Sequence, residues 1–156
     1  MIYVECRSDT VMARSLAAGV EVQHLFGTSR VCHKLMEQTD CKGMVDEGEG
    51  VKHPYIKELK ATGMIKEQPR CDLIVCEDKS RNNRLILVRP RLEEWIIETA
   101  HSVSLDPLRY RLPDQPDQLH DTLFLANRKV LNQFRIFVQR LLSTSYRMKT
   151  LAYLLR

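Results

Sequence analysis

Short apolar runs alternate with stretches of helical apolar spacing over the first hundred residues. The apolar runs predict five strands, at residues 2–5, 20–26, 43–46, 72–76 and 84–88. A spacing of three to four residues between apolar side chains predicts three helices, at residues 10–18, 29–38 and 54–62. This alternation is typical of an α/β fold, in which helices flank a mainly parallel sheet.

One of the later connections predicts a departure from a purely parallel sheet. The polar segment KSRNN, residues 79–83, is too short for a helical crossover, so the fourth and fifth strands are expected to be antiparallel neighbours. Gly63 is expected to end the third helix, and residues 64–71 to form a loop into the fourth strand.

The pattern after residue 90 is helical. LEEWIIETAHSV, residues 92–103, places its apolar residues on one side of a helix. Three prolines between residues 106 and 118 indicate a linker. From Leu119 to Leu142 the apolar spacing predicts one long amphipathic helix, and the last ten residues are expected to add a helical turn or to fray. We therefore expect three parts: an α/β domain, a proline-rich linker and a basic helical extension packed on the domain, over residues 1–105, 106–118 and 119–156.

Composition narrows the class of protein. A chain of 156 residues, 44% hydrophobic and 28% charged, fits one globular unit. No apolar run approaches the roughly 20 residues that cross a bilayer, and the N-terminus lacks the layout of a signal peptide, so a cytoplasmic protein without a membrane span is expected. The five cysteines form no C-x-x-C pair, which favours buried, reduced thiols over a zinc site.

Charge is distributed unevenly along the chain. Residues 122–156 carry seven basic residues and no acid, which leaves 17 basic and 20 acidic residues in 1–121. Two interpretations are open. The basic helix binds a nucleic-acid backbone, with Arg128 and Arg135 on its polar face, or it mediates a homodimer through its apolar face and the charge is incidental.

Acidic residues lie where predicted strands end. In such a sheet, ligands bind at the carboxyl ends of the strands. Converging carboxylates repel one another unless a cation neutralises them, and hard oxygen ligands favour magnesium or manganese. The sequence thus predicts a metal site built from five acids at the ends of the first and third strands: Glu5, Asp9, Asp46, Glu47 and Glu49. Capping of a helix is a sufficient alternative role for Asp9, and solvation for the two loop glutamates.

Phosphate contacts are predicted at two further places. In FGTSR, Gly27 permits a tight turn and Ser29 begins a helix, an arrangement that offers free amide donors to an anion. Lys79, near the end of the fourth strand, could neutralise phosphate charge. An ordinary strand-to-helix turn and an exposed structural lysine are the alternative interpretations.

VECRSD and VDEGEG together resemble the Toprim domain of topoisomerases, primases and related nucleases. That family has a glutamate after its first strand, often as E-G-x-x-D, and a D-x-D pair after its third. FGTSR and RPRLEEW are similar to further family segments, so the resemblance covers roughly residues 1–100. Cys6 replaces the family glycine and Gly48 the second acid of D-x-D, so that role would pass to Glu47 or Glu49.

The resemblance implies a Rossmann-like fold and magnesium-dependent phosphodiester chemistry, with nucleic-acid cleavage as the expected reaction and Glu5, Asp9 and Asp46 as catalytic residues. Two other classes remain open. The imperfect D-x-D motif favours a non-catalytic Toprim-like or receiver-like module that binds nucleic acid, a nucleotide or a protein partner. An unrelated nuclease of the PIN type would also cluster acids on an α/β sheet.

Overall fold

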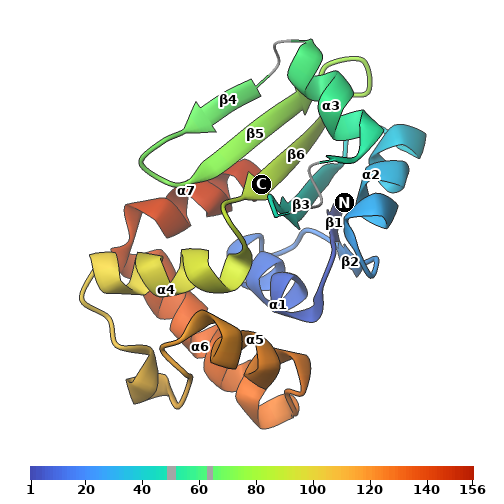
Figure 1. Ribbon diagram of the computed structural model, residues 1–156. Coiled ribbons are helices and arrows are strands. Elements are labelled where there is room, and N and C mark those ends of the chain that lie inside the picture. The colour runs from blue at the N-terminus through green and yellow to red at the C-terminus, as the bar shows by residue number, and fades with distance from the viewer. Residues whose placement is uncertain (49–51, 63–64) are drawn as a thin grey trace.

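The protein is built on one six-stranded sheet with the strand order β2-β1-β3-β6-β5-β4 (Figure 1). The computed structural model describes residues 1–48, 52–62 and 65–156. The strands are β1 (Ile2–Val4), β2 (Val22–His24), β3 (Lys42–Asp46), β4 (Ile65–Gln68), β5 (Leu73–Asp78) and β6 (Asn83–Val88). The first four strands of this order are mutually parallel, while β5 is antiparallel to both of its neighbours. The α/β prediction is confirmed, with a sheet that is mixed and mostly parallel.

Helices cover both faces of the sheet. They are α1 (Arg7–Leu16), α2 (Thr28–Glu37), α3 (Pro54–Ala61), α4 (Leu92–Ser102), α5 (Pro116–Phe124), α6 (Arg128–Thr144) and α7 (Tyr146–Leu155). Side chains of α2 and α3 share one buried cluster with the sheet, and those of the other five helices share a second. Figure 1 shows α2 and α3 next to each other, at the right of the sheet.

The two clusters follow from the alternation of side chains along each strand. Ile2 and Val4 point into the cluster with α1, whereas Tyr3 between them points to α2 and α3. The same division separates Met44 from Val45. Both faces of the central strands are therefore apolar, as expected for a sheet buried on both sides.

Trp95 ties the C-terminal helices to the sheet. It is fully buried in α4, and its indole N–H donates to the Cys71 carbonyl at 2.5 Å. The guanidinium of Arg147, from α7, lies 5.3 Å from the centre of the Trp95 ring. The buried residues of α5, α6 and α7 thus belong to the same core as those of the sheet.

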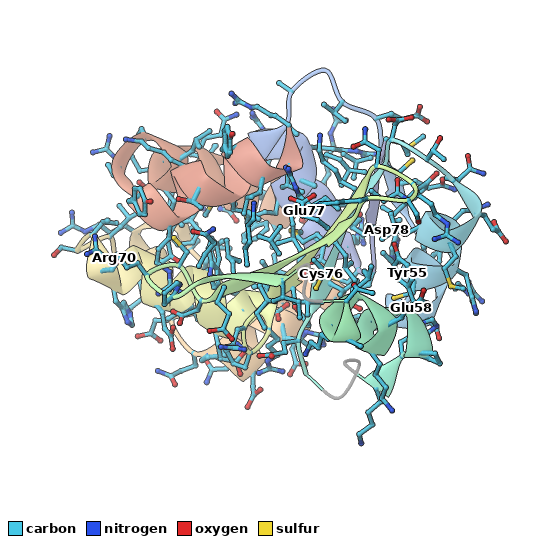
Figure 2. All side chains as sticks on the ribbon, turned by 90° about the horizontal axis from the view of Figure 1, so that it is seen from above. Tyr55, Glu58, Arg70, Cys76, Glu77 and Asp78 are labelled. Atoms are coloured by element: carbon cyan, nitrogen blue, oxygen red, sulfur yellow. The ribbon has the colours of Figure 1, made fainter. Side chains whose placement is uncertain are left out.

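The hairpin between β5 and β6 confirms the predicted antiparallel pair. Asp78 at the end of β5 accepts hydrogen bonds from the backbone N–H of Ser80 and Arg81, which closes the turn. Its other oxygen accepts from the Tyr55 hydroxyl of α3 at 2.9 Å, and the two side chains lie close together in Figure 2. Asp78 pairs with Asn83, the first residue of β6, so this turn lies at the edge where the parallel strands begin.

Several predicted boundaries were wrong. The expected loop at 64–71 contains β4, an edge strand held by backbone pairing with β5 although its sequence, IKEQ, lacks apolar alternation. The expected single helix over 119–142 breaks after α5, because Asn127 caps a new helix by accepting from the Val130 N–H. All of the last ten residues except Arg156 belong to helix α7, which begins at Tyr146. Gly63 lies outside the described residues.

Other features of the chain bear on its class. The segment 106–118 holds a 3-10 helix, Pro107–Tyr110, and the start of α5. All five cysteines are free, and four of them are buried. In the described part of the chain, no helix is both long enough and apolar enough to span a membrane.

Candidate functional site

Glu5 and Asp46 lie together at the carboxyl edge of the sheet. β1 and β3 are adjacent and parallel, so the residues that follow them emerge side by side. One carboxylate oxygen of Glu5, Oε1, accepts from the backbone N–H of Asp46 at 3.1 Å. The other, Oε2, accepts from the hydroxyl of Thr28 at the start of α2. The carboxylate of Glu5 is therefore held between two neighbouring elements.

Asp9 faces the same region from the first turn of α1. Cys6 is the N-cap of this helix: its thiol accepts from the Asp9 N–H at 3.4 Å, and its own N–H donates to Asp9 Oδ2 at 3.1 Å. This reciprocal pair is a capping box, with aspartate in the place usually taken by glutamate or glutamine. Asp9 is 2% exposed, so the capping role coexists with a buried carboxylate.

A fourth acid, Glu93, joins these three from the first turn of α4. Asp46 Oδ1 accepts from the Leu92 N–H at 2.8 Å, which fixes the start of α4 at the end of β3. Glu93 is 2% exposed, and its Oε1 contacts the Ser8 hydroxyl at 3.4 Å and His120 Nδ1 at 3.3 Å. We call Glu5, Asp9, Asp46 and Glu93 the acidic site.

Glu93 and Thr28 are site residues that sequence reasoning did not single out. The similarity of RPRLEEW to a Toprim segment pointed to the right region. It did not separate Glu93 from Glu94, which is adjacent, half-buried and paired with Arg91. In FGTSR, the reasoning chose Ser29, whereas Thr28 is the residue that binds Glu5.

Burial and mutual repulsion shift the acidity of the site. Burial, reinforced by the charges of Asp9, Glu5 and Glu93, raises the pKa of Asp46 to about 9. Burial, with the charges of Glu5 and Glu93 added, raises the pKa of Asp9 to about 7, although its hydrogen bonds to Cys6 oppose the shift. In the absence of a cation, Asp46 therefore keeps its proton at neutral pH.

The donor set of the acidic site is uniform in its chemistry. It consists of carboxylate oxygens, which magnesium and manganese prefer. Among the hydrogen bonds of the described residues, Asp9 uses only Oδ2 and Asp46 only Oδ1, so each has a second oxygen available. Within the same residues, no group of three or more histidine, cysteine or acidic side chains is placed to hold a metal ion.

One of the predicted metal ligands, Glu47, is engaged elsewhere in the structure. Glu47 forms a two-point ion pair with Arg89, at 2.5 and 3.0 Å, and this hydrogen bonding lowers the pKa of Glu47. A guanidinium thus neutralises the carboxylate of Glu47, which disfavours a role for it as a metal ligand. Glu49 lies outside the described residues.

The predicted phosphate contacts fall in three different places. Gly27 caps α2 with φ +116°, and its N–H donates to the Glu5 carbonyl at 3.0 Å, so this turn borders the acidic site. Ser29, in the first turn of α2, is exposed. Lys79 lies in the β5–β6 turn, next to the residues at which the parallel strands begin. Glu5 follows the other end of these strands, so Lys79 does not join the site. Arg128 and Arg135 line a groove between α1 and α6.

Comparisons of the chain with protein-family models, with curated proteins and with solved structures found no match. The sheet has a Rossmann-like layout, and such layouts carry many unrelated activities. The functional argument therefore rests on the acidic site.

Proposed function

We propose that the acidic site performs magnesium-dependent phosphodiester chemistry of the Toprim type, with cleavage of nucleic acid as the reaction. The observation that carries the proposal is the contact between Glu5 Oε1 and the Asp46 N–H. It brings together the two acids that VECRSD and VDEGEG supply from segments 41 residues apart.

The electrostatics of the site support a cation. Asp9 and Asp46 have raised pKa values because they are buried beside other carboxylates. A divalent ion removes this repulsion and allows the carboxylates to ionise, so metal binding releases protons and tightens as the pH rises. Bound magnesium would polarise a phosphoryl oxygen and neutralise its charge.

The side chains take distinct roles in this proposal. Asp46, Asp9 and Glu93 hold the magnesium through oxygens that hydrogen bonds do not occupy. Glu5 acts as general acid/base, held in place by the Thr28 hydroxyl and the Asp46 amide. The turn at Gly27 keeps the start of α2 against Glu5, which limits movement of its carboxylate.

The test compares the wild type with a Glu5→Gln, Asp46→Asn double variant. Magnesium and manganese are titrated while thermal stability and the cleavage of labelled single- and double-stranded DNA and RNA are followed. The control is a Glu58→Gln, Asp121→Asn variant, which makes the same two kinds of substitution at exposed positions on α3 and α5. We expect metal-dependent stabilisation and cleavage in the wild type and the control, and loss of both in the site variant. Cleavage that survives in the site variant would contradict the proposal.

A non-catalytic binding module is the second candidate. It is favoured by Gly48 in place of the second family acid and by the pairing of Glu47 with Arg89, which together leave the segment after β3 with fewer free carboxylates. Magnesium-dependent stabilisation of the wild type without cleavage of any of the four substrates would support this candidate.

A further inference from the structure

An open groove of about 870 Å³ lies between α1 and α6, away from the acidic site. Val11, Ser15 and Leu131 form part of its lining. Its charged and amide side chains come from one residue of α1 and five of α6: Arg14, Arg128, Lys129, Asn132, Arg135 and Gln139. We call this the basic groove. All six of these residues are exposed.

The cations of the basic groove are not neutralised by carboxylates of the described residues. Arg14, Arg128, Lys129 and Arg135 form no ion pair there, and neither the groove lining nor α6 contains an acid. By contrast, Arg84, Arg89 and Arg91 near the sheet are each paired with an acid. Four unpaired cations in one concave surface attract a polyanion.

The spacing along α6 fits a polymer better than a single phosphate. Arg128, Asn132, Arg135 and Gln139 follow one another at four, three and four residues, so they form one stripe along the helix. Eleven residues at 1.5 Å each span about 16 Å. One strand of B-DNA carries a phosphate every 3.4 Å along its axis, which places about five phosphates over that length. Guanidinium and amide groups are common donors to phosphate oxygens.

Helix α1 connects the basic groove with the acidic site. Arg14 lines the groove, and Arg7 lies seven residues earlier on the same side of the helix, where it is exposed beside the chain that leaves β1 at Glu5. Asp9 of the same helix belongs to the acidic site. Arg7 thus extends the exposed cations of α1 to the N-terminal end of the helix, whereas Asp9 lies on the buried side of the same helix.

We propose that the basic groove binds the phosphodiester backbone of a nucleic acid. The choice of nucleic acid as the polyanion rests on the proposed function. Arg14, on α1, acts together with Arg128 and Arg135, on α6, so that the backbone is held from both walls of the groove.

The test measures binding without cleavage. Labelled 20-nucleotide single- and double-stranded DNA and RNA are titrated in EDTA at several salt concentrations, with fluorescence anisotropy as the readout. The groove variant is Arg14→Gln, Arg128→Gln, Arg135→Gln. The control is Lys57→Gln, Lys66→Gln, Lys79→Gln, which loses the same charge from exposed positions on α3, β4 and the β5–β6 turn. Circular dichroism verifies that both variants fold.

We expect the groove variant to bind at least tenfold more weakly and to lower the slope of log K against log salt by about two to three, since each lost phosphate contact removes about 0.7 to 0.9. The control is expected to keep the wild-type slope. Equal weakening in both variants would overturn the proposal, because net charge alone would then explain the binding. Tighter binding of poly-glutamate than of any nucleic acid would also overturn the proposal.

The outcomes separate the groove from the proposed function. If the wild type binds in EDTA but never cleaves with magnesium, the groove proposal stands and the catalytic one fails. If the groove variant binds like the wild type while the wild type cleaves, the groove proposal fails and the catalytic one stands.

Discussion

Asp46 takes part in two structural contacts at the end of β3. Its carboxylate caps α4 through the Leu92 N–H, and its backbone N–H donates to Glu5. Because the same side chain is mostly buried beside three other acids, its charged form is disfavoured. One residue thus links the start of a helix to the electrostatics of the acidic site.

The raised pKa of Asp46 predicts a pH dependence for the metal-free protein. Between the ordinary value near 4 and the folded value of about 9, the folded state holds a proton that the unfolded state has lost, so the free energy of unfolding falls as the pH rises. We expect this fall to be smaller in Asp46→Asn, whose uncharged oxygen still accepts from Leu92. Thermal unfolding in EDTA at pH 5.5, 7 and 8.5 measures it. Asp121→Asn should behave like the wild type, and an unchanged slope in Asp46→Asn would contradict the expectation.

Glu93 and Glu94 form a matched pair for testing the metal. We expect Glu93→Gln to lose most of the stabilisation by magnesium, because it removes one carboxylate from the acidic site. Glu94→Gln should retain that stabilisation, since Glu94 pairs with Arg91. The change in melting temperature with 10 mM magnesium, relative to EDTA, is the measurement. Equal responses in the two variants would place Glu93 outside the metal site.

At the scale of elements, α6 divides its two faces between core and groove. Its buried residues are Phe134, Phe137, Val138 and Leu141, while its polar stripe lines the basic groove. The apolar face packs against the domain and holds the helix in place. The residues of the polar face do not take part in this packing. Structure and proposed binding therefore use different residues of one helix.

This division predicts unequal costs for neighbouring substitutions on α6. Phe137→Ala removes a fully buried ring and should lower the free energy of unfolding by about 3–5 kcal/mol. Ile136→Ala, at a position that is 47% exposed, should cost less than about 1.5 kcal/mol. Urea denaturation of the two variants checks the difference. Similar small losses in both would mean that α6 is only loosely attached.

At the scale of the molecule, the larger buried cluster joins the sheet with α1 and the four C-terminal helices. Ile86 and Val88 of the sheet, Trp95 of α4 and Leu151 of α7 all belong to it. Residues on both sides of the proline-containing segment 106–118 therefore bury the same apolar surface. A core of this kind favours cooperative unfolding.

We accordingly expect unfolding in a single transition. Trp95 is the only tryptophan, and it lies between α7 and the sheet, so its fluorescence reports on tertiary packing. Far-UV circular dichroism reports on all helices. The two midpoints in urea should coincide. A separate earlier loss of helical signal would mean that the C-terminal helices unfold on their own.

The sequence alone located β1, β3, β5, β6, α2 and α3 to within a few residues, because side-chain alternation and helical spacing are local properties of the chain. It also placed Glu5 and Asp46 correctly, since an acid that follows a buried strand must emerge at the edge of the sheet. It missed β4, whose pairing uses backbone groups, and it missed the break at Asn127, because apolar spacing continues across it.

Tertiary structure decided which of the polar residues meet. Glu93 enters the acidic site because Asp46 caps α4 across 46 residues, and Glu47 leaves it because Arg89 reaches it across 42. Both outcomes depend on strand order and on contacts between distant segments. Lys79 differs from them, because the short KSRNN turn already predicted the antiparallel direction of β5, which carries its end away from Glu5. The local pattern of apolar and polar residues specifies which face of each helix or strand is buried. It does not specify strand order or contacts between distant segments.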